Sequence, residues 1–104
     1  MIDVSDLSYS YRGAAKPAIS ELSFSVAPGE IFGFLGPSGA GKSTTQKILI
    51  KLLSGYSGRV TAFERDLAAW GPEYYERVGV AFELPNHFLR LSARRNLEYF
   101  AALY

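Results

Sequence analysis

A short stretch near the middle of the chain has the residue types and spacing needed to hold a phosphate group. It matches the pattern G-x-x-x-x-G-K-[ST]. Small and turn-forming residues let the backbone wrap around an anion and turn successive N–H groups toward it. Lys42 adds a mobile ammonium for the outer phosphates, and the Ser43 hydroxyl can serve as an oxygen ligand for a phosphate-bound Mg²⁺. The predicted phosphate-binding residues are Gly36, Pro37, Ser38, Gly39, Ala40, Gly41, Lys42, Ser43 and Thr44.

A strand and a helix must flank such a loop. Residues 31–35 are continuously apolar, which predicts a buried parallel strand. From Lys42 onward a helix is expected, because Ile48, Leu49, Leu52 and Leu53 recur at helical spacing before a stop at Gly55. Its first N–H groups and positive dipole end would face the same anion. The alternative is a glycine-rich turn that binds nothing.

Two strands are expected ahead of the loop. Apolar and polar residues alternate over 2–11, with one slip at Ser5-Asp6, and again over 22–26. The turn-forming residues 12–17 between them favour antiparallel pairing. An antiparallel β unit therefore precedes the predicted phosphate site.

The segment from Leu7 to Leu53 resembles the start of an ATP-binding-cassette (ABC) transporter ATPase of the kind found in bacterial drug and antibiotic exporters. The residues that carry the likeness are Tyr11, the stretch 22–26, and the run from Pro28 to Thr45. The resemblance implies an α/β P-loop NTPase fold, in which an antiparallel β unit is joined to the start of a parallel core sheet with helices. It also implies ATP and Mg²⁺ as ligands.

An aromatic residue ahead of the loop stacks on adenine in this family, and Tyr11 is the matching position. A tyrosine ring has a flat apolar face and a polar tip, which suits a purine half in solvent. The alternative is that Tyr11 is an ordinary packing residue of a strand.

Glu83 is a second candidate for the metal site. It follows the apolar stretch 78–82, another expected strand, and ligand-contacting residues lie at such strand ends in open α/β sheets. The family usually has glutamine here, which reaches Mg²⁺ and the attacking water. A carboxylate can also bind Mg²⁺, although it repels the γ-phosphate unless the metal lies between them. The alternative is a surface glutamate.

The remaining elements are shorter. Residues 58–63 read as a strand and 72–77 as a brief helix. By resemblance, the loop 84–91 would meet a transmembrane permease subunit, and its His87 is a loop residue and not a catalyst. Ser92 is expected to cap a helix with the apolar stripe Leu97, Phe100, Ala101 and Tyr104.

Composition limits the possible partners. The chain has 104 residues, 48% of them hydrophobic, a net charge of +1 and no cysteine. This charge offers no basic surplus for nucleic acid, and no apolar run approaches the roughly 20 residues that span a bilayer. Together with the resemblance, this predicts a cytoplasmic protein, peripheral on the inner face of the cell membrane.

Several family motifs have no match in the chain. There is no Leu-Ser-Gly-Gly-Gln signature, since Leu53-Ser54-Gly55 continues with Tyr56, and no apolar strand ends in Asp-Glu. The later switch histidine is also absent. We therefore expect residues 1–104 to be the N-terminal part of one ABC-type domain, inactive alone and prone to associate through unpaired strand edges. The full-length protein would pair with a second nucleotide-binding domain and power export.

Two other functions stay open on the sequence. One is another P-loop enzyme, such as a GTPase or a small-molecule kinase, although no Asn-Lys-x-Asp for guanine is present. The other is a regulatory module that holds a nucleotide without hydrolysing it.

Overall fold

The chain forms two compact units, Met1–Gly71 and Pro72–Tyr104. The computed structural model describes residues 1–82, 84 and 87–103. Glu83 and Tyr104, both singled out above, lie outside the described residues. In the described part of the chain, no helix has the length and apolarity needed to span a membrane.

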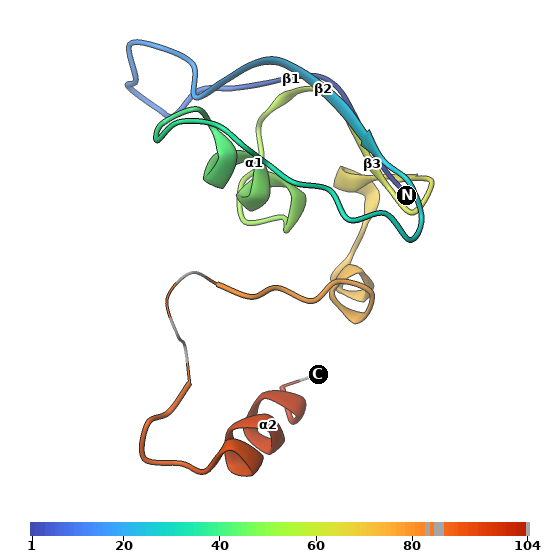
Figure 1. Ribbon diagram of the computed structural model, residues 1–104. Coiled ribbons are helices and arrows are strands. Elements are labelled where there is room, and N and C mark those ends of the chain that lie inside the picture. The colour runs from blue at the N-terminus through green and yellow to red at the C-terminus, as the bar shows by residue number, and fades with distance from the viewer. Residues whose placement is uncertain (83, 85–86, 104) are drawn as a thin grey trace. The chain divides into compact units, whose positions relative to one another are not determined.

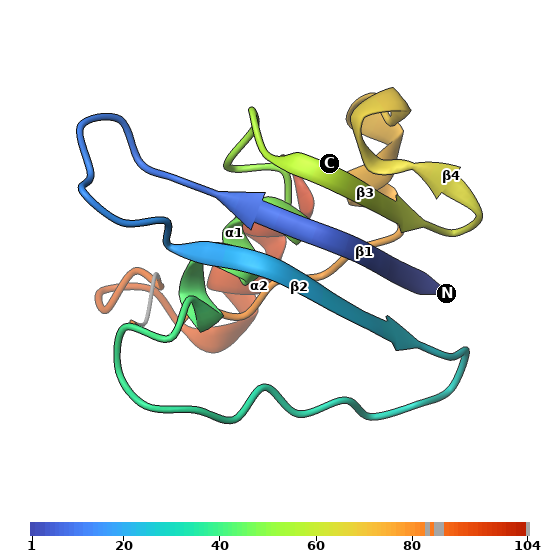
Figure 2. The same cartoon turned by 90° about the horizontal axis from the view of Figure 1, so that it is seen from above.

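The first unit is built on an antiparallel sheet. Its strands are β1 (Ile2–Tyr9), β2 (Ile19–Val26), β3 (Ser57–Ala62) and β4 (Arg65–Asp66), in the order β2-β1-β3-β4 (Figure 2). Every neighbouring pair is antiparallel. The predicted antiparallel pairing of the first two strands and the predicted strand near 58–63 are therefore confirmed.

The slip in the apolar pattern of β1 corresponds to an irregularity in the sheet. Val4 pairs with Phe24 and Leu7 with Leu22, and the register shifts between these pairs. Asp6, in the shifted segment, has a positive φ of 52°. This bulge lets Val4 and Leu7 both face the core, where they are 3% and 0% exposed, although they are three positions apart and would point to opposite faces of a regular strand.

The helix α1 (Lys42–Leu49) lies beneath this sheet (Figure 1). Its Ile48 is fully buried, and burial of such apolar side chains is the main force that holds helix and sheet together. A short helix, η1 (Leu67–Ala69), contributes Leu67. The buried apolar residues of this unit are Val4, Leu7, Ile19, Ile48, Val60, Ala62 and Leu67.

α1 ends earlier than the apolar spacing predicted. Ile50 caps it, and Lys51 follows with a left-handed φ of 60°. The amide of Leu52 donates to the Lys47 carbonyl at 2.8 Å. This hydrogen bond closes the last turn of the helix, and the chain changes direction after it. Leu52 is consequently 60% exposed, and the prediction of a helix through Leu53 was wrong.

The predicted parallel strands do not form among the described residues. Segments 31–35 and 78–82 have no strand pairing, and Ile31 and Leu35 are 100% and 96% exposed. A parallel strand needs backbone partners on its flanks, and the described chain supplies none to these segments. Only Phe32 and Phe34 pack, with ring centroids 5.2 and 5.0 Å from that of Phe24. The antiparallel part of the expected fold is thus present, and the start of a parallel core sheet does not occur in the described ranges.

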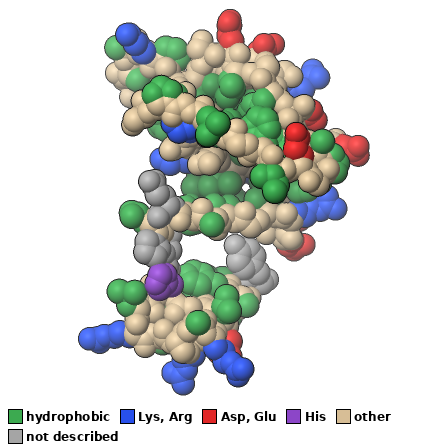
Figure 3. Space-filling model, viewed as in Figure 1, with side chains coloured by type: hydrophobic (Ala, Val, Ile, Leu, Met, Phe, Trp, Pro, Cys, Tyr) green, Lys and Arg blue, Asp and Glu red, His purple; other side chains and the backbone are tan. Residues whose placement is uncertain are grey.

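Apolar side chains therefore remain on the surface of the first unit. Figure 3 shows hydrophobic side chains, drawn green, on this surface. Ile31 and Leu35 are the extreme cases, whereas Phe34 between them is partly covered. The segment thus presents one side to Phe24 and the other to solvent.

The second unit contains η2 (Pro72–Glu76) and α2 (Ala93–Ala101). The brief helix expected at 72–77 is confirmed as a 3₁₀ helix. Ser92 caps α2 as predicted, because its Oγ accepts from the amide of Arg95 at 3.3 Å. The apolar stripe of α2 does not face a core, since Leu97 is 72% exposed, and the buried residue of this helix is Asn96.

Candidate phosphate-binding site

The loop 36–44 has backbone torsions suited to an anion. Gly39 and Gly41 have φ of 81° and 97°, and Ala40 between them is not among the positive-φ residues. Alternating signs of φ turn successive N–H groups toward one side, as in the anion-binding concavities called nests. A bond of 3.2 Å from the amide of Ala40 to the Pro37 carbonyl closes the turn.

The loop packs tightly against the chain that enters β2. A Cβ added at Gly41 would lie 2.6 Å from the Ala18 carbonyl oxygen and 3.2 Å from Ile19 Cγ1. Ala18 is itself held by its amide, which donates to Tyr9 O at 2.8 Å. The second glycine of the motif is therefore required here for space as well as for its φ.

The start of α1 leaves N–H groups available. Gly41 is the N-cap and provides no side-chain cap bond, and the first intrahelical bond runs from the amide of Thr45 to Gly41 O at 2.9 Å. The amides of Lys42, Ser43 and Thr44 precede that bond and so have no carbonyl partner within the helix. Their partial positive charge, with the helix dipole, favours an anion at this point.

The Lys42 ammonium lies against the loop itself. Its Nζ donates to the carbonyls of Gly36 and Pro37 at 2.6 and 2.7 Å. The cation is thereby held beside the predicted phosphate position by two neutral acceptors. A phosphate is a stronger, charged acceptor, so the ammonium can transfer to it at little cost.

Ser43 is exposed on the first turn of α1, where its hydroxyl can reach a metal carried by a phosphate. Within the described ranges, no three His, Cys, Asp or Glu side chains are grouped to hold an ion. Mg²⁺ commonly takes only one or two protein ligands and completes its octahedron with phosphates and waters. A single hydroxyl donor therefore fits Mg²⁺ that arrives with its nucleotide.

Tyr11, the residue predicted to stack on adenine, lies beside Thr44 at the start of α1. Its hydroxyl is 3.1 Å from Thr44 Oγ1, and its side chain is 41% exposed. This hydrogen bond was not foreseen, because no sequence pattern links two residues 33 positions apart. The structure thus brings Tyr11 together with Thr44, the last residue of the predicted loop, whereas Glu83 lies outside the described residues.

The described part of the loop 84–91 exposes apolar side chains. Leu84, Phe88 and Leu89 are 75%, 47% and 88% exposed. Asn96 of α2 holds the turn: its Oδ1 accepts from the Phe88 amide at 2.7 Å, and its Nδ2 lies 3.2 Å from Leu91 O. This role was not predictable from the sequence, since Asn96 resembles any polar residue on a helix. Asn96 differs from the other polar residues of α2 in being buried.

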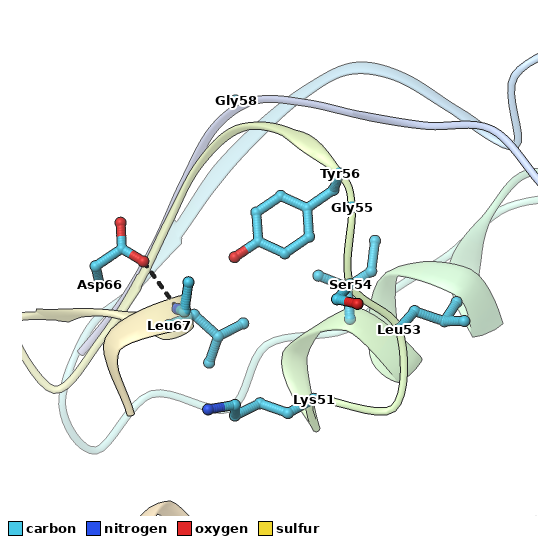
Figure 4. A pocket seen from close by; sticks show the side chains of 10 residues that line it. Lys51, Leu53, Ser54, Gly55, Tyr56, Gly58, Asp66 and Leu67 are labelled. Atoms are coloured by element: carbon cyan, nitrogen blue, oxygen red, sulfur yellow. Dashed lines mark hydrogen bonds between the residues drawn. The ribbon is translucent and has the colours of Figure 1, made fainter. Parts of the chain in front are cut away.

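A cavity of about 290 Å³ lies at the opposite end of α1 (Figure 4). Tyr56 points into it, and burial, reinforced by the negative charge of Asp66, raises the pKa of the Tyr56 phenol above 10.0. Lys51 and Asp66 are engaged within the fold, with Trp70 O and the Ala68 amide respectively. The cavity contains no predicted site residue, and Leu53-Ser54-Gly55 lies here, away from the phosphate loop.

Comparison with known proteins gives a consistent result. A family model described as ABC transporter matches residues 19–103. The chain is 55% identical over all 104 residues to the fluoroquinolones export ATP-binding protein of Mycobacterium tuberculosis. It is 34% identical over 97 residues to the bacitracin transport ATP-binding protein of Bacillus licheniformis. It is 37% identical over 99 residues to the Nod factor export ATP-binding protein I of Rhizobium meliloti.

These matches include almost all of the chain but a smaller part of each relative. They cover 100%, 93% and 95% of this chain, and 35%, 31% and 29% of the three relatives. The chain therefore spans about a third of the length of the curated proteins it matches.

Proposed function

The chain belongs to the ABC transporter family, and from this premise we propose that it holds Mg-ATP and that the complete protein hydrolyses ATP to power export. The observation that carries this proposal is the joint placement of three features: the nest at residues 39–41, the open start of α1, and the exposed ring of Tyr11 beside it. The first two features suit the phosphates, and the third suits the base.

Each group takes a defined role. Within the loop 36–44, backbone N–H groups and the Lys42 ammonium bind the phosphates, with Thr44 at the helix start; Pro37 has no N–H and shapes the turn. Ser43 contributes one oxygen to Mg²⁺, which neutralises phosphate charge when bound. The exposed face of Tyr11 stacks on adenine. Glu83 stands where the family usually has glutamine and is proposed as a further metal ligand.

Hydrolysis requires a magnesium carboxylate and a group that orients water, and in this family both come from an apolar strand that ends in Asp-Glu; the 104 residues contain no such sequence. We therefore expect the chain alone to bind nucleotide without turnover. This matches the second candidate function, a nucleotide-holding module, as a description of the isolated chain.

Export is the direction supported by the relatives. Two of the three are named for export, of fluoroquinolones and of Nod factor, and the third for bacitracin transport. By extension, the complete protein would export a small organic compound and act at the cytoplasmic face of the membrane. Its permease would meet the loop 84–91, whose exposed Leu84 and Leu89 offer apolar contacts, and a second nucleotide-binding domain would complete the assembly.

Nucleotide selectivity separates this proposal from another P-loop enzyme. Equilibrium titrations with ATP and with GTP, each with Mg²⁺, are expected to show tighter binding of ATP and no release of phosphate. Tighter binding of GTP would favour the GTPase alternative. Measurable turnover would contradict the assignment of hydrolysis to residues outside this chain.

Glu83→Gln tests the second metal ligand. If Glu83 binds Mg²⁺, the variant should change how strongly ATP affinity depends on the metal, because a carboxylate is the stronger oxygen donor. Identical magnesium dependence in the two proteins would remove Glu83 from the site.

A further inference from the structure

The side chain of Tyr11 is attached at its tip to α1. Its hydroxyl lies 3.1 Å from Thr44 Oγ1, and Thr44 is buried, at 8% exposure, while Tyr11 is 41% exposed. The partner is therefore a fixed group of the helix, and the ring that it holds remains open to solvent on part of its surface.

The same ring is restrained at a second point. Tyr9 of β1 meets it edge to face, with centroids 5.1 Å apart and planes at 88°. The backbone is also held, because the Ala14 amide donates to Tyr11 O at 3.0 Å. A tyrosine side chain has only two main torsions, so contacts at the ring and at the hydroxyl leave it little freedom.

This restraint has a consequence for binding. A mobile side chain must be ordered when a ligand stacks on it, and that lost freedom weakens the complex. A ring that is already ordered avoids the loss. A phenylalanine at the same position would have the same stacking face but no bond to the helix.

We propose that Thr44 is a positioning residue for Tyr11: the hydrogen bond between their hydroxyls holds the ring in the orientation that receives the adenine. This inference rests on the proposed function. It assigns to the Thr44 side chain a contribution to base binding, in addition to any contact of its backbone with phosphate, and it links the base-binding group directly to the phosphate-binding helix.

The test compares a ligand that has a base with one that does not. Tyr11→Phe should weaken ATP binding about three- to tenfold, the usual effect of losing one hydrogen bond. Binding of inorganic tripolyphosphate should stay within about twofold, because it offers nothing to stack on the ring. Tyr56→Phe is the matched control: it removes a phenol from the same unit at the other end of α1 and should change neither affinity.

A double-mutant cycle shows whether Thr44 is the partner. Thr44→Val removes the hydroxyl with little change in volume, and Thr44→Ser preserves it. Tyr11→Phe should weaken ATP binding in the wild-type and Thr44→Ser backgrounds but not in Thr44→Val. Circular dichroism verifies folding, and if Thr44→Val is unfolded, the ATP and tripolyphosphate comparison for Tyr11→Phe decides alone.

Three results would overturn the inference: unchanged or tighter ATP binding by Tyr11→Phe, an equal loss for tripolyphosphate, or the same loss with and without the Thr44 hydroxyl. Failure of the proposed function gives a different result, since the wild-type chain would then bind neither ATP nor tripolyphosphate.

Discussion

Gly41 is the residue whose replacement should do most damage to the phosphate loop. Its φ of 97° and the 2.6 Å approach of an added Cβ to Ala18 O both oppose any side chain. Gly41→Ala should lower the free energy of unfolding of the first unit by about 2–4 kcal/mol, because torsional strain and a clash with backbone add together.

Gly39→Ala is the matched control for this prediction. Gly39 also has a positive φ, of 81°, but an added Cβ meets nothing within 4 Å. Its cost should be limited to the torsional term, about 1–2 kcal/mol. Urea titrations of both variants measure the difference, and equal destabilisation would show that the contact with Ala18 is unimportant.

Because of Tyr56, we expect the free energy of unfolding of the first unit to fall at alkaline pH. Burial, with a smaller effect from Asp66, raises the pKa of its phenol in the folded state above 10.0. The unfolded chain therefore loses this proton first, so the stabilisation is fully present below pH 10 and is lost as pH rises through the folded-state pKa.

The measurement is the urea midpoint between pH 9 and 12, compared with that of Tyr56→Phe. The wild-type midpoint should fall more steeply than that of the variant, which has no phenol to ionise at this position. Parallel curves would mean that Tyr56 ionises alike in the folded and unfolded states.

At the scale of single residues, the sequence indicated which side chains could bind a ligand, but it did not indicate which residues contact one another in the fold. Lys42 and Ser43 could be predicted as phosphate and metal contacts because residue types and spacing alone define the phosphate-binding pattern. The attachment of Lys42 to Gly36 O and of Tyr11 to Thr44 could not, since each depends on side-chain geometry set by the fold.

Among the elements, α2 and the turn before it depend on one buried side chain. Asn96 accepts from the Phe88 amide at 2.7 Å and donates toward Phe88 O at 3.1 Å. Asn96→Ala would leave these backbone groups without their partner, at a cost of about 1–3 kcal/mol where they stay shielded from water. Hydrogen exchange at the Phe88 amide should accelerate by roughly tenfold or more.

Arg94→Ala is the control, because Arg94 is exposed on the same helix. It should leave the exchange of the Phe88 amide unchanged. If Asn96→Ala also leaves it unchanged, the turn 88–91 is held by its own backbone and by the contact of Phe88 with Tyr99, whose centroids lie 4.9 Å apart.

Elements defined by local pairing were predictable, and those that require distant partners were not. The alternation in β1 and β2 and the turn between them sufficed for an antiparallel hairpin, including the slip at Ser5-Asp6. The apolar stretch 31–35 was read correctly as hydrophobic but wrongly as a strand, because strand formation depends on neighbours that the stretch itself does not specify. For the same reason, the apolar stripe of α2 did not show whether that face of the helix would be buried, and Leu97 is exposed.

For the whole molecule, the exposed apolar side chains predict association. Ile31 is 100% and Leu35 96% exposed, on a segment that pairs with no strand in the described part of the chain. Such a combination favours pairing with another chain. The chain should therefore sediment faster as its concentration rises, and a double substitution of Ile31 and Leu35 by lysine should reduce the effect.

Gln46→Lys adds charge at an exposed polar position of α1 and serves as the control. It should not alter the association. A wild-type chain that sediments as a monomer at every concentration tested would show that the exposed segment does not self-pair.

The most direct test of the central claim is calorimetric titration of the folded chain with Mg-ATP, repeated with Lys42→Ala. We predict saturable binding with a dissociation constant below millimolar that weakens by about tenfold or more in the variant, since a charge-assisted bond to phosphate is lost. A well-folded chain that ignores millimolar ATP, or a variant that binds as tightly as the wild type, would contradict the assignment of residues 36–44 as a nucleotide site.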